Sequence, residues 1–181
     1  MYKRQASKGR FWSAAPEWLA QAKPTSDGGN SLLLSFIQEI DMCIDKTLSR
    51  LKDGYQIDAF LWHQGESDYA KSKDYYRNLK TMVAYVRMHL TEKTGKDYSR
   101  LPFIFGTVAR SNKYFSREVE NAMKQLAAED PNMHLIDMSG AELLNDRLHF
   151  TAHSAEYLGQ QVYKQLEQII KGVIVRTDEL K

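Results

Sequence analysis

The sequence predicts an α/β fold in which a parallel sheet is covered by helices. Apolar residues recur at three- and four-residue spacing in four segments of the chain, which is the periodicity of amphipathic helices. Between these segments lie three short apolar runs, and such runs are typical of buried strands. Helices that alternate with strands along a chain are characteristic of parallel sheets.

The first helix is predicted to begin at Ser31 and to end near Gly54. Its apolar stripe consists of Leu33, Ile37, Ile40, Ile44, Leu48 and Leu51. Cys43, the one cysteine, falls in this region; it excludes an internal disulfide and is expected to be a small core residue. The short, aromatic and apolar run Ile57–His63 (IDAFLWH) is the first predicted strand.

The remaining elements follow in order. Strands are predicted at Pro102–Val108 (PFIFGTV) and His134–Met138 (HLIDM). The helix before them ends at Gly95, and the other two helices follow one strand each. The apolar positions of these three helices are Tyr75, Leu79, Met82, Val83, Val86 and Leu90; Val119, Ala122, Met123 and Leu126; and Leu158, Val162, Leu166, Ile169 and Ile170. His89 and His134 fall within a helix and a strand, so both are expected to be structural.

Length and charge limit the classes of function. At 181 residues the chain fits a single domain, residues 1–181, without internal repeats. A formal net charge of +2 is too small to indicate binding to nucleic acid or to an anionic membrane. No apolar run approaches the roughly 20 residues that a membrane span requires.

The N-terminal region is predicted to be irregular. Met1–Gln5 (MYKRQ) resembles the translation of a transposon end used in preparing sequencing libraries. These residues are therefore expected to be a processing scar, with the natural protein starting earlier; the alternative is a basic, disordered N-terminus. Ala6–Asn30 contains prolines, a Gly-Gly turn, Trp12 and Trp18, and is interpreted as loop with short helical pieces.

A cluster of polar and flexible residues, HQGESD, begins where the first predicted strand ends. Ligands bind beyond the carboxyl ends of parallel strands, which makes this segment a candidate site. Gln64 can direct its amide N–H2 at a developing oxyanion, and Gly65 permits a tight turn. Glu66 is expected to lock a neighbouring side chain or to hold Gln64. The structural alternative is a capped loop in which Ser67 or Asp68 begins the next helix.

A second polar segment, Asn145–His153 (NDRLHFTAH), precedes the C-terminal helix. Asp146 and His149 are three positions apart, so the carboxylate can reach the imidazole within a single turn. An aspartate that accepts from one ring nitrogen fixes the tautomer and leaves the other nitrogen free to act as a base. The same spacing also occurs in ordinary surface pairs, which is the alternative interpretation.

Two other chemistries remain open at this point. Ser67 could be a nucleophile, although GESD lacks the second glycine of the G-x-S-x-G elbow. A metal could instead bind at the candidate ligands His63, Glu66, Asp68, Asp146 and His149. These spacings lack the further ligands of common zinc patterns, so no metal or other cofactor is predicted. His153 is expected to be a loop or capping residue.

Together, the two polar segments resemble the SGNH-hydrolase superfamily, specifically its branch of sialate O-acetylesterases and related carbohydrate acetylesterases. That branch carries a W-H-Q-G-E-S-D block after its third strand and a D-x-x-H-F block before its last helix. Here the blocks stand as Trp62–Asp68 and Asp146–Phe150. Leu101–Val108 is similar to the fourth strand of the family, and the resemblance runs from Ile57 onward. It implies a three-layer αβα fold with a flavodoxin-like parallel sheet.

The resemblance also implies a serine esterase that removes O-acetyl groups from carbohydrates such as sialic acid or plant polysaccharide. His149 would be the general base, oriented by Asp146. Gln64, followed by Gly65 and Glu66, would take the oxyanion position. The expected second oxyanion donor is the backbone N–H of Gly9. The expected partner is an acetylated carbohydrate, with neither nucleic acid nor membrane as a partner.

The nucleophile is where the sequence departs from the family. The serine of the family lies in a Gly-Gln-Ser-Asn-like motif after the first strand, and no such motif occurs here. We therefore expect the chain to lack the first strand or strands of the sheet and to be inactive by itself. Residues 57–63 would then form an exposed apolar edge. The alternative function is a non-catalytic carbohydrate-binding remnant or pseudoenzyme, in which Trp12, Trp18 and Trp62 stack on sugars.

Overall fold

The computed structural model describes residues 32–178. The predictions for the N-terminal region, including those for Gly9, Trp12 and Trp18, lie outside these residues. The described chain forms two compact units, each built from two segments. The first unit contains residues 32–56 and 77–99, and the second contains residues 57–76 and 100–178.

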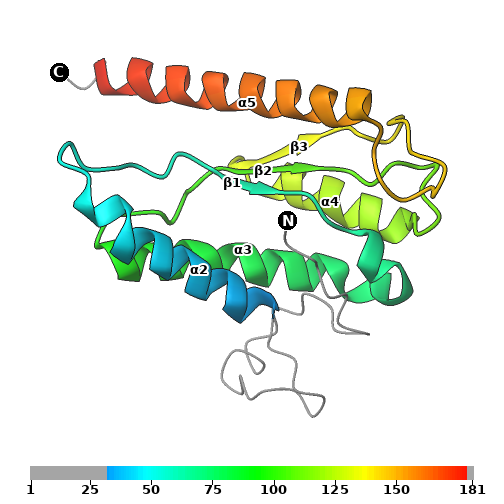
Figure 1. The fold of residues 1–181 in the computed structure, drawn as a ribbon, viewed down its shortest axis with the longest axis horizontal. Helices are drawn as coiled ribbons and strands as arrows, with labels where there is room; N and C mark the ends of the chain where they lie inside the picture. The colour runs from blue at the N-terminus through cyan, green and yellow to red at the C-terminus, as the bar shows by residue number, and fades with distance from the viewer. Residues whose placement is uncertain (1–31, 179–181) are drawn as a thin grey trace, which may run out of the picture. The chain divides into compact units, whose positions relative to one another are not determined.

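The second unit is built on a three-stranded parallel sheet (Figure 1). Its strands are β1 (Phe60–Trp62), β2 (Phe103–Gly106) and β3 (Met133–Ile136), in the order β1-β2-β3. Each strand overlaps one of the three predicted runs but is shorter than the run. The predicted α/β class with a parallel sheet is therefore confirmed.

The continuously apolar sequence of β2 follows from its position as the central strand of the sheet. Phe103, Ile104 and Phe105 are each only 1% exposed, as expected for a strand that is covered on both faces. The edge strand β1 is different, because the side chain of Leu61 is 55% exposed although its backbone partner in β2 is the buried Ile104.

Two helices cover opposite faces of this sheet (Figure 1). α4 (Arg117–Glu129) follows Ser116, whose hydroxyl accepts a hydrogen bond from the Val119 N–H and caps the helix. α5 (Ala152–Asp178) covers the other face. Its residues Leu158, Val162, Leu166 and Ile169 pack against Ile104, Ile136 and Met138. Helix, sheet and helix form the three layers that the family resemblance implied.

The first unit is helical. α2 (Leu32–Lys46) is followed by the short 3-10 helix η1 (Leu48–Arg50), so the single helix predicted to reach Gly54 is interrupted. The remainder of this unit comes from α3 (Ser72–Thr94), of which residues 77–94 belong here. α3 begins three residues before its first predicted apolar position, Tyr75, and ends just before Gly95.

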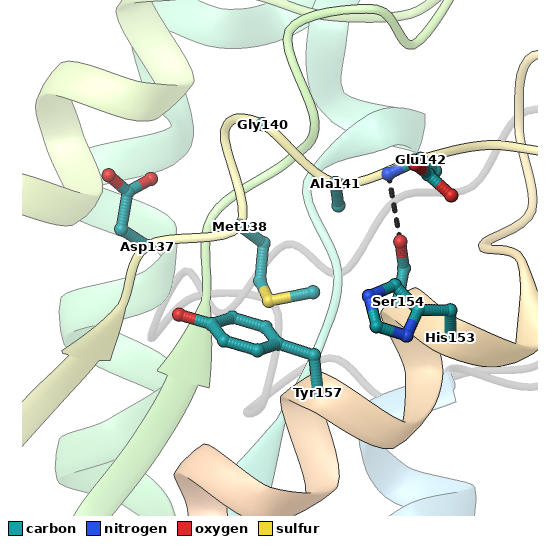
Figure 2. A pocket seen from close by; sticks show the side chains of 8 residues that line it. All are labelled: Asp137, Met138, Gly140, Ala141, Glu142, His153, Ser154 and Tyr157. Carbon is teal, nitrogen blue, oxygen red and sulfur yellow. Dashed lines mark hydrogen bonds between the residues drawn. The ribbon is translucent and has the colours of Figure 1, made fainter.

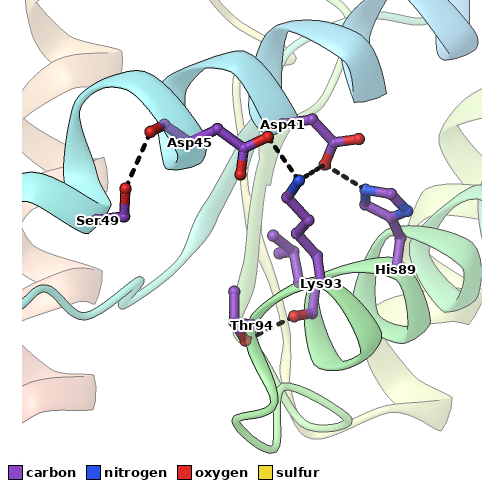
Figure 3. Close-up of polar contacts among 7 residues, drawn as sticks. Asp41, Asp45, Ser49, His89, Lys93 and Thr94 are labelled. Atoms are coloured by element: carbon purple, nitrogen blue, oxygen red, sulfur yellow. Dashed lines mark hydrogen bonds and ion pairs between the residues drawn. The ribbon is translucent and has the colours of Figure 1, made fainter.

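Polar side chains join α2 to α3 (Figure 3). His89 Nε2 lies 2.8 Å from Asp41 Oδ1, and Lys93 Nζ lies 2.8 Å from Asp45 Oδ2 and 4.0 Å from Asp41 Oδ1. These contacts agree with the structural role predicted for His89.

The prediction for Cys43 was wrong. Its side chain is exposed on α2, whereas the next residue, Ile44, is 5% exposed. One residue rotates an α-helix by about 100°, so a single step from the apolar stripe is enough to place the thiol in solvent.

Candidate active site

The HQGESD segment leaves the carboxyl end of β1 and turns directly into a 3-10 helix, η2 (Glu66–Lys71). Hydrogen bonds hold both the side chain and the backbone of Gln64. Its side-chain Nε2 donates to Asp68 Oδ2 at 2.5 Å, and its backbone carbonyl accepts from the Tyr75 hydroxyl at 2.9 Å. The amide nitrogen carries two N–H groups, so the bond to Asp68 leaves one donor for a ligand.

Two details of the predicted turn differ in the structure. Asp68, and not Glu66, holds the Gln64 side chain. Ser67 and Asp68 do not cap the following helix, because both lie inside η2. The residue before η2 is Gly65, so η2 has no side-chain cap.

Gly65 is required by the close approach of its neighbours. A Cβ at this position would lie 2.8 Å from Val108 Cγ2, 3.1 Å from Val119 Cγ1 and 3.2 Å from Met123 Cε. Any larger residue would therefore push against buried side chains of the β2–α4 region. The sequence predicted a glycine turn here, and the structure gives packing as the physical reason.

His63 connects the two polar segments. Its ring packs against the ring of Phe150, with centroids 4.9 Å apart, so the segment that holds Gln64 lies beside the segment that holds His149. His63 Nε2 also lies 3.8 Å from Glu66 Oε1. Burial lowers the pKa of His63, and the Glu66 carboxylate partly opposes that effect. The neutral form of His63 is therefore favoured, and its ring packs on Phe150.

Asp146 and His149 form a hydrogen-bonded pair. Asp146 Oδ2 lies 2.5 Å from His149 Nδ1, while Oδ1 accepts from the backbone N–H groups of Leu148 and His149 at 2.9 and 3.1 Å. A carboxylate only accepts, so Nδ1 carries a proton, and in the neutral form of the ring the lone pair is on Nε2. The His149 side chain is 69% exposed. This is the tautomer and the access that a general base requires.

The same hydrogen bonds set the charge of Asp146. They hold the pKa of its carboxyl well below the ordinary range, with the His149 side chain contributing most and the backbone N–H groups of His149 and Leu148 next. Asp146 is therefore ionised at neutral pH, where it can stabilise a positive charge on the imidazole.

Backbone contacts hold the loop that carries the pair. The Leu144 N–H donates to the His149 carbonyl at 2.8 Å, and the Thr151 N–H donates to the Glu142 carbonyl at 3.1 Å. On the other side, the Asn112 side chain donates to the Leu148 carbonyl at 3.2 Å. These contacts, which the sequence did not indicate, tie the loop to the segment that follows β2.

Asp68 gives a prediction about pH and stability. Its side chain is buried, at 2% exposure, and burial raises the pKa of its carboxyl against the opposing effect of the Gln64 hydrogen bond. Because the folded state then holds this proton more tightly than the unfolded state, the contribution of Asp68 to stability falls as pH rises above the ordinary carboxyl pKa of about 4. Asp68→Asn, whose amide oxygen can still accept from Gln64, should remove that loss.

Thermal melts followed by circular dichroism at several pH values test this. The Tm of Asp68→Asn relative to the unchanged protein should increase between about pH 4 and pH 7. Asp53→Asn, at an exposed position, is the matched control and should show no such trend. A difference in Tm that stays constant with pH would contradict the role assigned to burial.

Residues 32–178 contain no group of three or more His, Cys, Asp or Glu side chains placed to hold a metal ion. In the same part of the chain, no helix combines the length and the apolar character needed to cross a membrane.

Comparisons with known proteins point to one family. Residues 23–168 match the family described as carbohydrate esterase, sialic acid-specific acetylesterase. The probable carbohydrate esterase At4g34215 of Arabidopsis thaliana is 29% identical over 119 residues, covering 64% of this chain and 42% of the relative. The 1.6 Å X-ray structure of the Arabidopsis thaliana protein AT4G34215 superposes with a TM-score of 0.60 at 26% identity, covering 77% of this chain and 53% of that one. The chain thus spans about half the length of these relatives.

Proposed function

This chain belongs to the carbohydrate esterase family of sialic acid-specific acetylesterases, and on that premise we propose that the protein hydrolyses O-acetyl esters of carbohydrates. The observation that carries the proposal is the Asp146–His149 pair, in which the carboxylate holds Nδ1 and the imidazole side chain is exposed. A hydrogen-bonded pair of this kind activates a hydroxyl nucleophile in serine esterases.

In the proposed reaction, His149 Nε2 accepts the proton of a serine hydroxyl as the serine oxygen attacks the acetyl carbonyl. Asp146 stabilises the imidazolium that results. The spare amide N–H of Gln64 donates to the oxyanion of the tetrahedral intermediate. His149 then returns the proton to the sugar oxygen as the ester bond breaks. Water, activated by the same nitrogen, releases acetate from the acetyl-serine.

The nucleophile in this proposal is a serine outside residues 1–181. The support is that the sequence has no Gly-Gln-Ser-Asn-like segment. Ser67 is the alternative. It lies in η2, and within residues 32–178 no hydrogen bond joins its hydroxyl to His149. We therefore expect residues 1–181 alone to release no acetate.

The test compares residues 1–181 with the protein encoded by the uninterrupted open reading frame that contains them. Acetate release is measured from an aryl acetate and from an acetylated oligosaccharide, and each protein is treated with a fluorophosphonate before mass spectrometry. Activity and labelling of an added serine would support the proposal. Labelling of Ser67 would overturn the placement of the nucleophile. Sugar binding without acetate release from either protein would overturn the esterase function itself and favour a binding role.

Gln64→Ala provides a second prediction for the active form. Removing one oxyanion donor is expected to lower kcat about a hundredfold to a thousandfold with little change in KM, because the bond forms only as charge develops. Gln38→Ala, an exposed glutamine on α2, is the matched control. Equal effects of the two substitutions would contradict the role of Gln64.

A further inference from the structure

One side of α5 faces away from the sheet and carries a regular stripe of exposed side chains. The opposite side packs on the sheet through residues that include Leu158 and Val162. Gln160 lies two positions from each of them and therefore points outward, because two residues rotate an α-helix by about 200°. A shallow groove on this outer side is lined by Glu156, Gly159, Gln160, Tyr163, Lys164 and Glu167. Tyr163 is 67% exposed, so the stripe presents an aromatic ring as well as charges to solvent.

The charges of the stripe are symmetric about Gln160. Glu156 lies four positions before it and Lys164 four positions after it. When two copies of a helix pack antiparallel around a two-fold axis at Gln160, each residue faces the residue equally far beyond the axis in the second copy. Glu156 of each copy then faces Lys164 of the other. No like charges meet, because the remaining charged residue of the groove, Glu167, faces His153. The stripe is thus complementary to a second copy of itself.

A hollow of about 280 Å³ lies at one edge of the stripe, between α5 and the loop after β3. Figure 2 shows the Tyr157 ring beside Met138, with the Asp137 and Glu142 carboxylates pointing away from them. The Ser154 hydroxyl, also in the lining, is engaged by the Glu142 N–H at 2.8 Å. A cavity of about 150 Å³ is enough to hold benzene. The hollow therefore has the room and the largely apolar walls that an aromatic ring requires.

Tyr163 of a second copy is placed to enter this hollow. Tyr157 and Tyr163 lie three positions to either side of Gln160, so in the same antiparallel pair the Tyr163 ring of one copy faces Tyr157 of the other. Tyr157 is 44% exposed, which leaves surface for a second ring to cover. Because the two-fold axis repeats every contact, both tyrosines and both hollows are used.

We propose that α5 is the interface of a symmetric homodimer, in which two copies of this helix pack antiparallel around Gln160. The Glu156–Lys164 pairs fix the register, since charge pairs select the partner more than they add affinity. Tyr163 of each copy fills the hollow beside Tyr157 of the other and contributes the larger part of the binding energy. A contact along one pair of helices is small for an interface, so the dimer is reversible, with a Kd in about the micromolar range.

Charge reversal tests the register. Sedimentation velocity of residues 1–181 at about 5–500 μM should show monomer and dimer in exchange. Glu156→Lys or Lys164→Glu alone places like charges opposite each other twice, and each should weaken dimerisation at least about tenfold. A mixture of these two variants should form a heterodimer, and the variant with both substitutions should dimerise like the unchanged protein. Glu39→Lys and Lys46→Glu, at exposed positions of α2, are the controls for net charge and should have no effect.

Substitutions at Tyr163 and Gln160 test the other contacts. Tyr163→Ala should weaken dimerisation at least about tenfold, while Tyr163→Phe keeps the ring and most of the affinity. Gln160→Cys is made in a Cys43→Ser background, because Cys43 is exposed. The two-fold axis places the introduced thiols opposite each other, so oxidation should give a disulfide-linked dimer. Gln168→Cys, also exposed, should not, since it would lie about 24 Å from its counterpart along the helix axis.

Two results would overturn the proposal. One is a protein that stays monomeric up to about 500 μM and gives no cross-link with Gln160→Cys. The other is association that Glu156→Lys and Lys164→Glu leave unchanged, because the contact would then lie on another surface, such as the edge strand β1. The dimer goes beyond the esterase proposal and does not rest on it. Neither readout uses a substrate, so failure of the dimer and failure of the esterase function are separate results.

Discussion

Replacing His149 with alanine in the product of the uninterrupted reading frame is expected to lower kcat/KM for acetate release about a thousandfold or more. His149 Nε2 is the only atom to which the proposed mechanism assigns proton transfer, in both the formation and the breakdown of the acetyl-serine. Asp146→Asn should lower the rate nearly as far, because an amide N–H2 at this position would face Nδ1 as a donor and favour the wrong tautomer.

His153→Ala is the control for that experiment, since His153 is also exposed and lies at the start of α5. A comparable loss of kcat with His153→Ala would contradict the assignment of the base. His149→Ala also has a readout that does not depend on turnover. The largest contribution to the low pKa of Asp146 comes from His149, so the carboxyl pKa measured by NMR should rise toward its ordinary value. An unchanged pKa would show that the pair does not form in solution.

Gly65→Ala is expected to reduce the free energy of unfolding by about 1–3 kcal/mol, the range typical of overpacking a well-filled core. The new methyl group would lie 2.8 Å from Val108 Cγ2 and 3.1 Å from Val119 Cγ1, so either the turn or these buried side chains must shift. Gln64 is the preceding residue, and a shift of about 1 Å in a catalytic group can cost about a hundredfold in rate. The same variant should therefore lose both stability and activity.

Gly159→Ala is the matched substitution. Gly159 lies within α5, where an added Cβ would meet nothing within 4 Å, and alanine is preferred to glycine inside a helix by about 0.5–1 kcal/mol. Urea denaturation should thus show opposite signs for the two variants. If Gly65→Ala is as stable as the unchanged protein, the packing argument for this glycine is wrong.

The sequence predicted the parts of the molecule that depend on local patterns. The strands around β1, β2 and β3 could be identified because buried parallel strands are continuously apolar, and α4 because its apolar residues keep a helical spacing. The Asp146–His149 pair could also be predicted from the sequence, since its two residues are three positions apart. At Cys43, by contrast, a single position along the helix decided between core and solvent.

Interactions across the fold could not be predicted in this way. The packing of His63 on Phe150 and the bond from Asn112 to the Leu148 carbonyl join distant parts of the chain. No pattern in a single sequence specifies which loops meet beyond the sheet. The Gln64–Asp68 bond was missed for a different reason: Asp68 lies inside the 3-10 helix η2, which replaced the expected loop and cap.

The short separation of Asp146 and His149 has a consequence for folding order. Closing so small a loop costs little chain entropy, and Asp146 adds two bonds to backbone N–H groups within the same turn. The pair can therefore form before the sheet is complete, whereas the Gln64 segment meets the segment that carries the pair only after β1 has docked and the rings of His63 and Phe150 have met. Native-state hydrogen exchange should accordingly find the Leu148 amide protected in partly unfolded forms in which the Gln64 segment is already open.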